Sequence, residues 1–103
     1  MRERAITLGK IADVLRARGQ LDEALRIQRE EEIPVYEALG DVRELLFGRK
    51  NLALTLRARS RPGDIEEARD LLTLALVAAE GLQVPEAQTI RQLLVEITPP
   101  GAV

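Results

Sequence analysis

The sequence has no cysteine, histidine or tryptophan, and Tyr36 and Phe47 are its only aromatic residues. Disulfides, thiolate or imidazole metal sites and histidine-based acid–base or nucleophilic arrangements are therefore excluded. No run approaches the roughly 18 apolar residues that a membrane span requires, and the first residues, MRERAITLGK, lack the apolar stretch of a secretory signal. We therefore expect a non-catalytic, cytoplasmic protein without a cofactor, a metal site or a membrane contact.

What is present is typical of a small helical protein. Of the 103 residues, 46% are hydrophobic, mostly Leu and Ala, and 31% are charged, with a formal net charge of −2. This length fits one domain, and this composition favours helices. The near-balanced charge gives no general attraction to nucleic acid or anionic lipid, so binding to either would need a local cluster.

An internal repeat is the most informative feature. ADVLRARGQLDEAL at residues 12–25 resembles ALTLRARSRPGDIEEA at residues 53–68. The four letters LRAR recur after 41 residues, and the match resumes at a distance of 44 after the inserted Ser60-Arg61-Pro62. Periods of this size are typical of helical solenoids, in which each unit buries its apolar face against its neighbours. We expect the insertion to lengthen a turn and bulge outward without disturbing either packed helix.

The spacing within each unit is helical. Apolar residues at positions 8, 11, 12 and 15 share one helix face, and Gly19 can end that helix in a left-handed conformation. Asp41 and Asp64 each precede a glutamate by three residues and can cap helix starts. Pro34 should kink its helix between Glu32 and Val35.

These patterns predict an all-α fold of two antiparallel helical hairpins followed by a terminal helix. We expect helices at about 3–18, 22–39, 42–59, 65–81 and 86–97. They form a single domain over 1–97, with the first repeat at about 3–40, the second at about 42–82 and the terminal helix at about 86–97. The remaining residues, 98–103, should form a flexible tail.

The two units resemble the tetratricopeptide repeat family, in its long-repeat bacterial variety. The family's small residue, turn glycine and second-helix alanine are matched by Ala12, Gly19 and Ala24, and again by Ala53, Gly63 and Ala68. The resemblance implies a right-handed helical repeat that binds proteins or peptides and is not catalytic. Its first helices would line a concave groove, at positions Gly9, Asp13, Arg16, Lys50, Leu54 and Arg57. Three of these positions lie on each first helix. The carboxylate-binding version of that groove has Lys at the first and Asn at the second of the three, and only Lys50 matches it here.

Two charged clusters suggest other functions. Arginines at positions 16, 18, 57, 59 and 61 make a basic corner, and the alternative function is a regulatory or nucleic-acid-associated adaptor that uses it. Interleaved aromatic residues that could stack bases are missing there, which disfavours nucleic acid. Glu30-Glu31-Glu32 is interpreted as a solvated face, because consecutive helical residues point about 100° apart and do not converge on one ion.

Self-association is expected on two grounds. LLTLALVAAEGL, at 71–82, is apolar nearly all the way round; it is either a central helix covered by its neighbours or a helix shared with another chain. Two repeats are also fewer than solenoids usually need, and nothing polar covers the first helix near Ile11. We predict a homo-oligomer, most simply a two-fold dimer, through Ile6, Leu8, Leu72 and Leu76. The alternative is that upstream repeats are missing.

Overall fold

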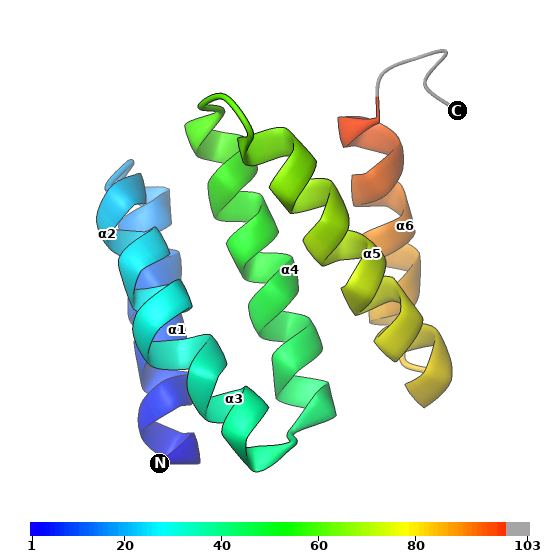
Figure 1. Cartoon of the computed structure of the whole chain (residues 1–103), viewed down its shortest axis with the longest axis horizontal. Coiled ribbons are helices and arrows are strands. Elements are labelled where there is room, and N and C mark those ends of the chain that lie inside the picture. The colour runs from blue at the N-terminus through cyan, green and yellow to red at the C-terminus, as the bar shows by residue number, and fades with distance from the viewer. Residues whose placement is uncertain (99–103) are drawn as a thin grey trace.

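The computed structural model describes residues 1–98, and over this range all of the regular secondary structure is helical (Figure 1). The elements are α1 (Arg2–Ala17), α2 (Leu21–Ile27), the π-helical turn η1 (Gln28–Glu32), α3 (Ile33–Leu39), α4 (Val42–Arg59), α5 (Asp64–Leu82) and α6 (Glu86–Ile97). Because α2, η1 and α3 are continuous, they form one composite helix. The all-α class and the five predicted helices are confirmed, each boundary within one residue. Apart from Thr98, the predicted tail lies outside the described residues.

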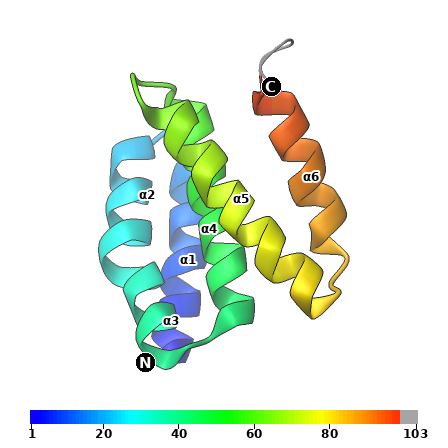
Figure 2. The same cartoon turned by 45° about the vertical axis from the view of Figure 1, so that its right-hand side comes forward.

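The helices lie side by side in chain order, and each runs antiparallel to the one before it (Figures 1 and 2). α1 packs on the composite helix, α4 packs on the composite helix and on α5, and α6 packs on α5. The molecule is a slab with extents of 43 × 32 × 19 Å. Within residues 1–98, no helix combines the length and the apolar character needed to cross a bilayer.

The helix ends follow the expected turn chemistry with one exception. Gly19 adopts a φ of 78° just after α1, as predicted. The Asp41 side chain caps α4 by accepting a hydrogen bond from the Glu44 N–H at 3.2 Å, also as predicted. The exception is Asp64, which is the first residue of α5 rather than its cap, because Gly63 takes the capping position with a φ of 88°.

Asp64 instead fixes the inserted turn. Its buried carboxylate accepts the Arg61 N–H at 3.0 Å and two guanidinium hydrogen bonds from Arg59, at 2.8 and 2.9 Å. The hydrogen bonds from Arg59 lower the pKa of Asp64 to about 2. Arg59 and Arg61 also each donate to Asp22 at 3.0 Å. The insertion is exposed, as expected, and it also joins the second hairpin to the start of α2.

The composite helix contains one more residue than α5 over the matched length. Up to the first residue of η1, each residue of the composite helix corresponds to the residue 44 positions later, so that the buried Gln28 corresponds to the buried Leu72. After η1 the distance is 43, and Gly40 corresponds to Gln83, both left-handed helix ends. In η1 the Ile33 N–H donates to the carbonyl of Gln28, five residues back. The prediction was a kink between Glu32 and Val35. The irregularity found is a π-helical turn over Gln28–Glu32 that ends two residues before Pro34, which has no N–H to donate.

The interior contains two apolar clusters. The main cluster is centred on α4, α5 and α6 and includes Leu46, Leu56 and Ile90, all fully buried. The smaller cluster lies within the first hairpin and is made of Ala12, Ala24 and Ile27, with Leu8 and Leu15 packed on it. The first hairpin is thus held by fewer and smaller apolar side chains than the second.

Candidate functional site

Of the three groove residues expected on α1, Gly9 and Arg16 contact neighbouring helices, and Asp13 pairs with Arg16 within α1. Gly9 is buried beneath the side chain of Glu32 from the composite helix, and a Cβ there would lie 2.8 Å from the Glu32 Cδ. Asp13 lies 3.6 Å from the guanidinium of Arg16, which donates to the Asn51 carbonyl of α4 at 3.0 Å. The expectation that Gly9 faces an open groove is therefore corrected, because Glu32 covers it.

The three groove residues on α4 are more accessible. Arg57 donates to Glu96 of α6 at 2.9 Å, the Lys50 ammonium lies 5.6 Å from the centre of the Phe47 ring, and Leu54 is half-buried. Arg57 follows Arg16 by 41 residues, and each reaches forward to a later helix, from α1 to α4 and from α4 to α6. The two arginines act as equivalent links within the chain, and the six predicted residues do not form one open surface.

The Arg57 link should contribute little to folding. Because Arg57 and Glu96 are both well exposed, Arg57→Ala should lower the free energy of unfolding by about 0.5 kcal/mol or less. Urea denaturation followed by circular dichroism measures this change. The groove hypothesis itself predicts that replacing Arg16, Lys50 and Arg57 together changes the set of proteins captured from a native lysate; recovery of an identical set would contradict it.

An apolar surface lies on the outer side of α1. We call this surface, made of Thr7, Lys10, Ile11, Val14 and Arg18, the α1 face; with Leu15 these residues line a shallow hollow. Ile11 is 44% exposed and Val14 is 52% exposed, whereas the residues 41 positions later in α4, Leu52 and Thr55, are 3% and 0% exposed. The equivalent surface of α4 is covered by the first hairpin. The α1 face is thus a helix-packing surface that the described residues leave open.

The other predicted association residues lie partly or wholly inside the molecule. Ile6 and Leu8 are half-buried, and Leu76 packs partly buried against the main core. Leu72 is a core residue, because α4 and α6 enclose its side of α5, and its expected place at an interface is corrected. The exposed apolar side chains in the middle of α5 are Leu74 and Val77, at 52% and 67%. Most of the apolar surface of α5 is therefore buried inside the molecule, as expected of a central helix.

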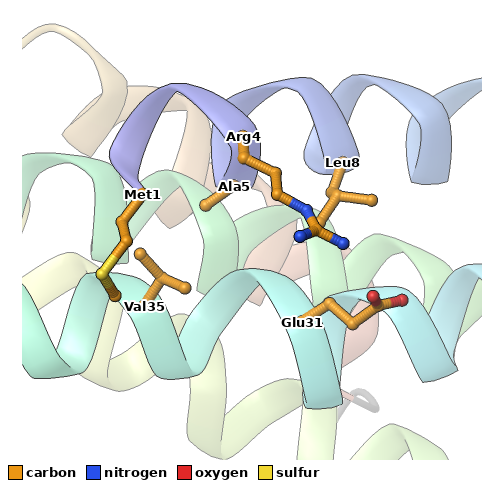
Figure 3. A pocket seen from close by; sticks show the side chains of 6 residues that line it. All are labelled: Met1, Arg4, Ala5, Leu8, Glu31 and Val35. Carbon is orange, nitrogen blue, oxygen red and sulfur yellow. The ribbon is translucent and has the colours of Figure 1, made fainter.

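A pocket of about 320 Å³ opens between α1 and the composite helix (Figure 3). Ala5, Leu8 and Val35 supply apolar walls, and the side chains of Arg4 and Glu31 come from opposite sides. The remaining lining residue is Met1. The pocket thus combines apolar walls with one guanidinium and one carboxylate.

A buried polar cluster joins α1 to the composite helix, and it corrects the interpretation of Glu30-Glu31-Glu32 as a solvated face, because Glu32 is 4% exposed. Gln28 and Glu32 are buried, at positions that Leu72 and Ala75 fill in α5. The Tyr36 hydroxyl donates to Glu32 Oε2 at 3.0 Å, whereas Glu32 Oε1 and both amide atoms of Gln28 have no hydrogen-bond partner among residues 1–98. Burial is the largest cause that raises the pKa of Glu32 to about 7; the hydrogen bond from Tyr36 opposes the rise, and the nearby Asp13 and Glu44 carboxylates contribute to it. The same described range contains no group of three or more acidic side chains placed to hold a metal ion.

The arginine corner is largely neutralised by ion pairs. Arg59 and Arg61 pair with Asp22, Arg57 pairs with Glu96, and Arg16 pairs with Asp13. Among the described residues, Arg18 is the member of the corner without an ion pair. This distribution gives the corner less capacity to hold phosphate than its sequence suggests.

Comparison of the chain with protein-family models, with curated protein sequences and with solved structures finds no match. The geometry of the α1 face and the internal repeat are thus the features from which a function is inferred.

Proposed function

We propose that this chain is a non-catalytic protein-interaction and self-association module, built as a tetratricopeptide-like right-handed helical repeat. The observation that carries the proposal is the contrast between α1 and α4. At matched positions of the repeat, α4 is buried by a neighbouring hairpin, whereas α1 exposes Ile11 and Val14.

The buried surface on α4 indicates what kind of partner fits α1. On that surface Gly48 lies against the composite helix, and a Cβ there would be 3.3 Å from Ile33 and 3.4 Å from Tyr36. Repeat proteins bury such faces by stacking similar helical units. Covering the α1 face with another helix would gain roughly 25 cal/mol per Å² of apolar surface, before the entropic cost of association. The partner is therefore a helical protein segment, and in the first instance a second copy of this chain.

Replacing both Ile11 and Val14 with glutamine should abolish self-association without unfolding the chain. Both side chains are already substantially exposed, so polar replacements remove little intramolecular contact. Sedimentation equilibrium should show the wild-type mass rising with concentration toward that of a dimer, whereas the variant keeps the monomer mass with unchanged helical circular dichroism.

A matched control is Leu39→Gln, which changes an apolar residue of α3 that is similarly exposed and should leave the mass curve unaltered. A wild-type chain that stays monomeric and fully helical at high micromolar concentration would contradict self-association. Partner capture would then be the part of the proposal left to test.

A further inference from the structure

We propose that the α1 face docks on α5 of a second copy, with the two helices antiparallel and Arg18 opposite Asp70, Val14 opposite Leu74 and Ile11 opposite Val77. This inference rests on the self-association proposed above and specifies which surface of the second copy is used.

The surface on α5 is a second amphipathic stripe. Glu66, Asp70, Leu74 and Val77 are all exposed and share one side of α5, because they follow one another at four, four and three residues. The opposite side of α5 holds Leu72, Ala75 and Ala79 in the core. Within residues 1–98, neither Glu66 nor Asp70 takes part in an ion pair. The stripe therefore presents two apolar side chains next to two uncompensated carboxylates.

Charge favours this pairing over the symmetric alternatives. The outer side of α1 carries Lys10 and Arg18, neither of which forms an ion pair within the described residues. Its one acidic side chain, Glu3, lies in the first turn, 3.8 Å from the terminal ammonium. With the apolar pairs facing, a parallel pairing of two like helices would oppose Arg18 with Arg18 or Asp70 with Asp70. An antiparallel pairing of like helices would set Arg18 opposite Thr7 and Asp70 opposite Gly81, where neither charge gains a partner. Packing α1 against α5 brings opposite charges together, which aids both encounter and register.

The order of residues along each helix determines whether α1 and α5 of the second copy pack parallel or antiparallel. In α1 the apolar pair precedes the cation, since Arg18 comes four residues after Val14. In α5 the anion precedes the apolar pair, since Asp70 comes four residues before Leu74. Only an antiparallel alignment lets the apolar pairs face each other while the charges meet. The apolar residues are also spaced identically, by three positions in each helix.

In each α1–α5 contact the two copies use different surfaces. One contact leaves an α1 face free on one copy and an α5 stripe free on the other. The assembly therefore either closes as a two-fold pair with two identical contacts or grows by adding further copies.

Charge reversal with rescue tests the proposal. Arg18→Asp and Asp70→Arg should each weaken association at least about tenfold, since each places like charges in contact. The chain carrying both reversals should associate with wild-type affinity, within about threefold, because the pair is restored with its signs exchanged. Sedimentation velocity across concentration, with circular dichroism on the same samples, measures affinity and folding together.

The control is Glu37→Arg, the same type of reversal at an exposed position of α3, which should leave association unchanged. If wild type associates but either reversal leaves affinity unchanged, or the double variant shows no rescue, the α1–α5 contact is overturned while self-association stands. If wild type itself does not associate at high micromolar concentration, both self-association and this interface are overturned.

Discussion

Gly9→Ala should destabilise the protein by about 1 kcal/mol, although the same substitution within a helix ordinarily stabilises. Alanine is favoured over glycine by about 1 kcal/mol in a helix interior. Here the new Cβ would lie 2.8 Å from Glu32 Cδ and 3.2 Å from Glu32 Oε1. Overpacking of this kind costs about 1–3 kcal/mol, and moving the Glu32 carboxylate, which is 4% exposed, would disturb its 3.0 Å hydrogen bond from Tyr36. The clash should therefore exceed the gain in helix propensity.

The sign of this effect should reverse when Glu32 is shortened. In a Glu32→Ala background, which reproduces the alanine found at the matched position of α5, Gly9→Ala should stabilise by about 1 kcal/mol. Urea denaturation of the four chains at a concentration where wild type is monomeric gives the coupling energy. Gly81→Ala serves as the control, because nothing lies within 4 Å of a Cβ there. A stabilising Gly9→Ala in the wild-type background would show that Glu32 does not occupy the space above Gly9.

The helices could be predicted because their boundaries are encoded locally. Gly19 and Asp41 fix a helix end and a helix start through their own backbone and side chain, and both behave as expected. The π-helical turn could not be located in the same way. Pro34 indicated an irregularity, but whether the chain kinks or inserts a residue depends on how Gln28 and Glu32 pack against α1, which no local pattern specifies.

The candidate site was harder to predict because the residues on one face of a helix do not specify which other helix packs against that face. Leu72 and Leu74 are both apolar residues of the same helix, yet one lies in the core and the other is exposed. Their difference depends on which side α6 covers, and α5 is too uniformly apolar to indicate that side. The repeat did contain a usable pattern: aligning α1 on α4 at a distance of 41 compares Ile11 with the buried Leu52 and identifies an uncovered packing surface.

Raising the pH from about 4.5 to above 7 should lower the stability of the wild-type chain relative to its Glu32→Gln variant. The pKa of Glu32 rises from 4.5 to about 7 in the folded chain, because burial penalises the carboxylate. Below pH 4.5 the group is protonated in both the folded and the unfolded state, so it adds no pH dependence. Between the two values only the unfolded state ionises, and stability falls as pH rises.

The size of the expected change in the free energy of unfolding follows from the interval between the two pKa values, 4.5 and about 7. One pKa unit corresponds to about 1.4 kcal/mol, so the full difference between wild type and Glu32→Gln should change by about 3 kcal/mol across it. Glutamine is nearly isosteric and can still accept the hydrogen bond from Tyr36, so the variant removes the charge while the packing above Gly9 stays the same. Other carboxylates, such as Asp22 and Asp64, have lowered pKa values and affect both chains equally.

The measurement is the free energy of unfolding of both chains from pH 4 to 9, with the difference plotted against pH. The difference should be flat above about pH 8 and should shrink toward low pH, with its steepest part between 4.5 and 7. Since Asp13 of α1 and Glu44 of α4 also face Glu32, Asp13→Asn should shift the midpoint of this curve to lower pH. A difference that does not vary with pH would mean that water reaches Glu32 in solution, and that the composite helix is held to α1 more loosely than the buried carboxylate indicates.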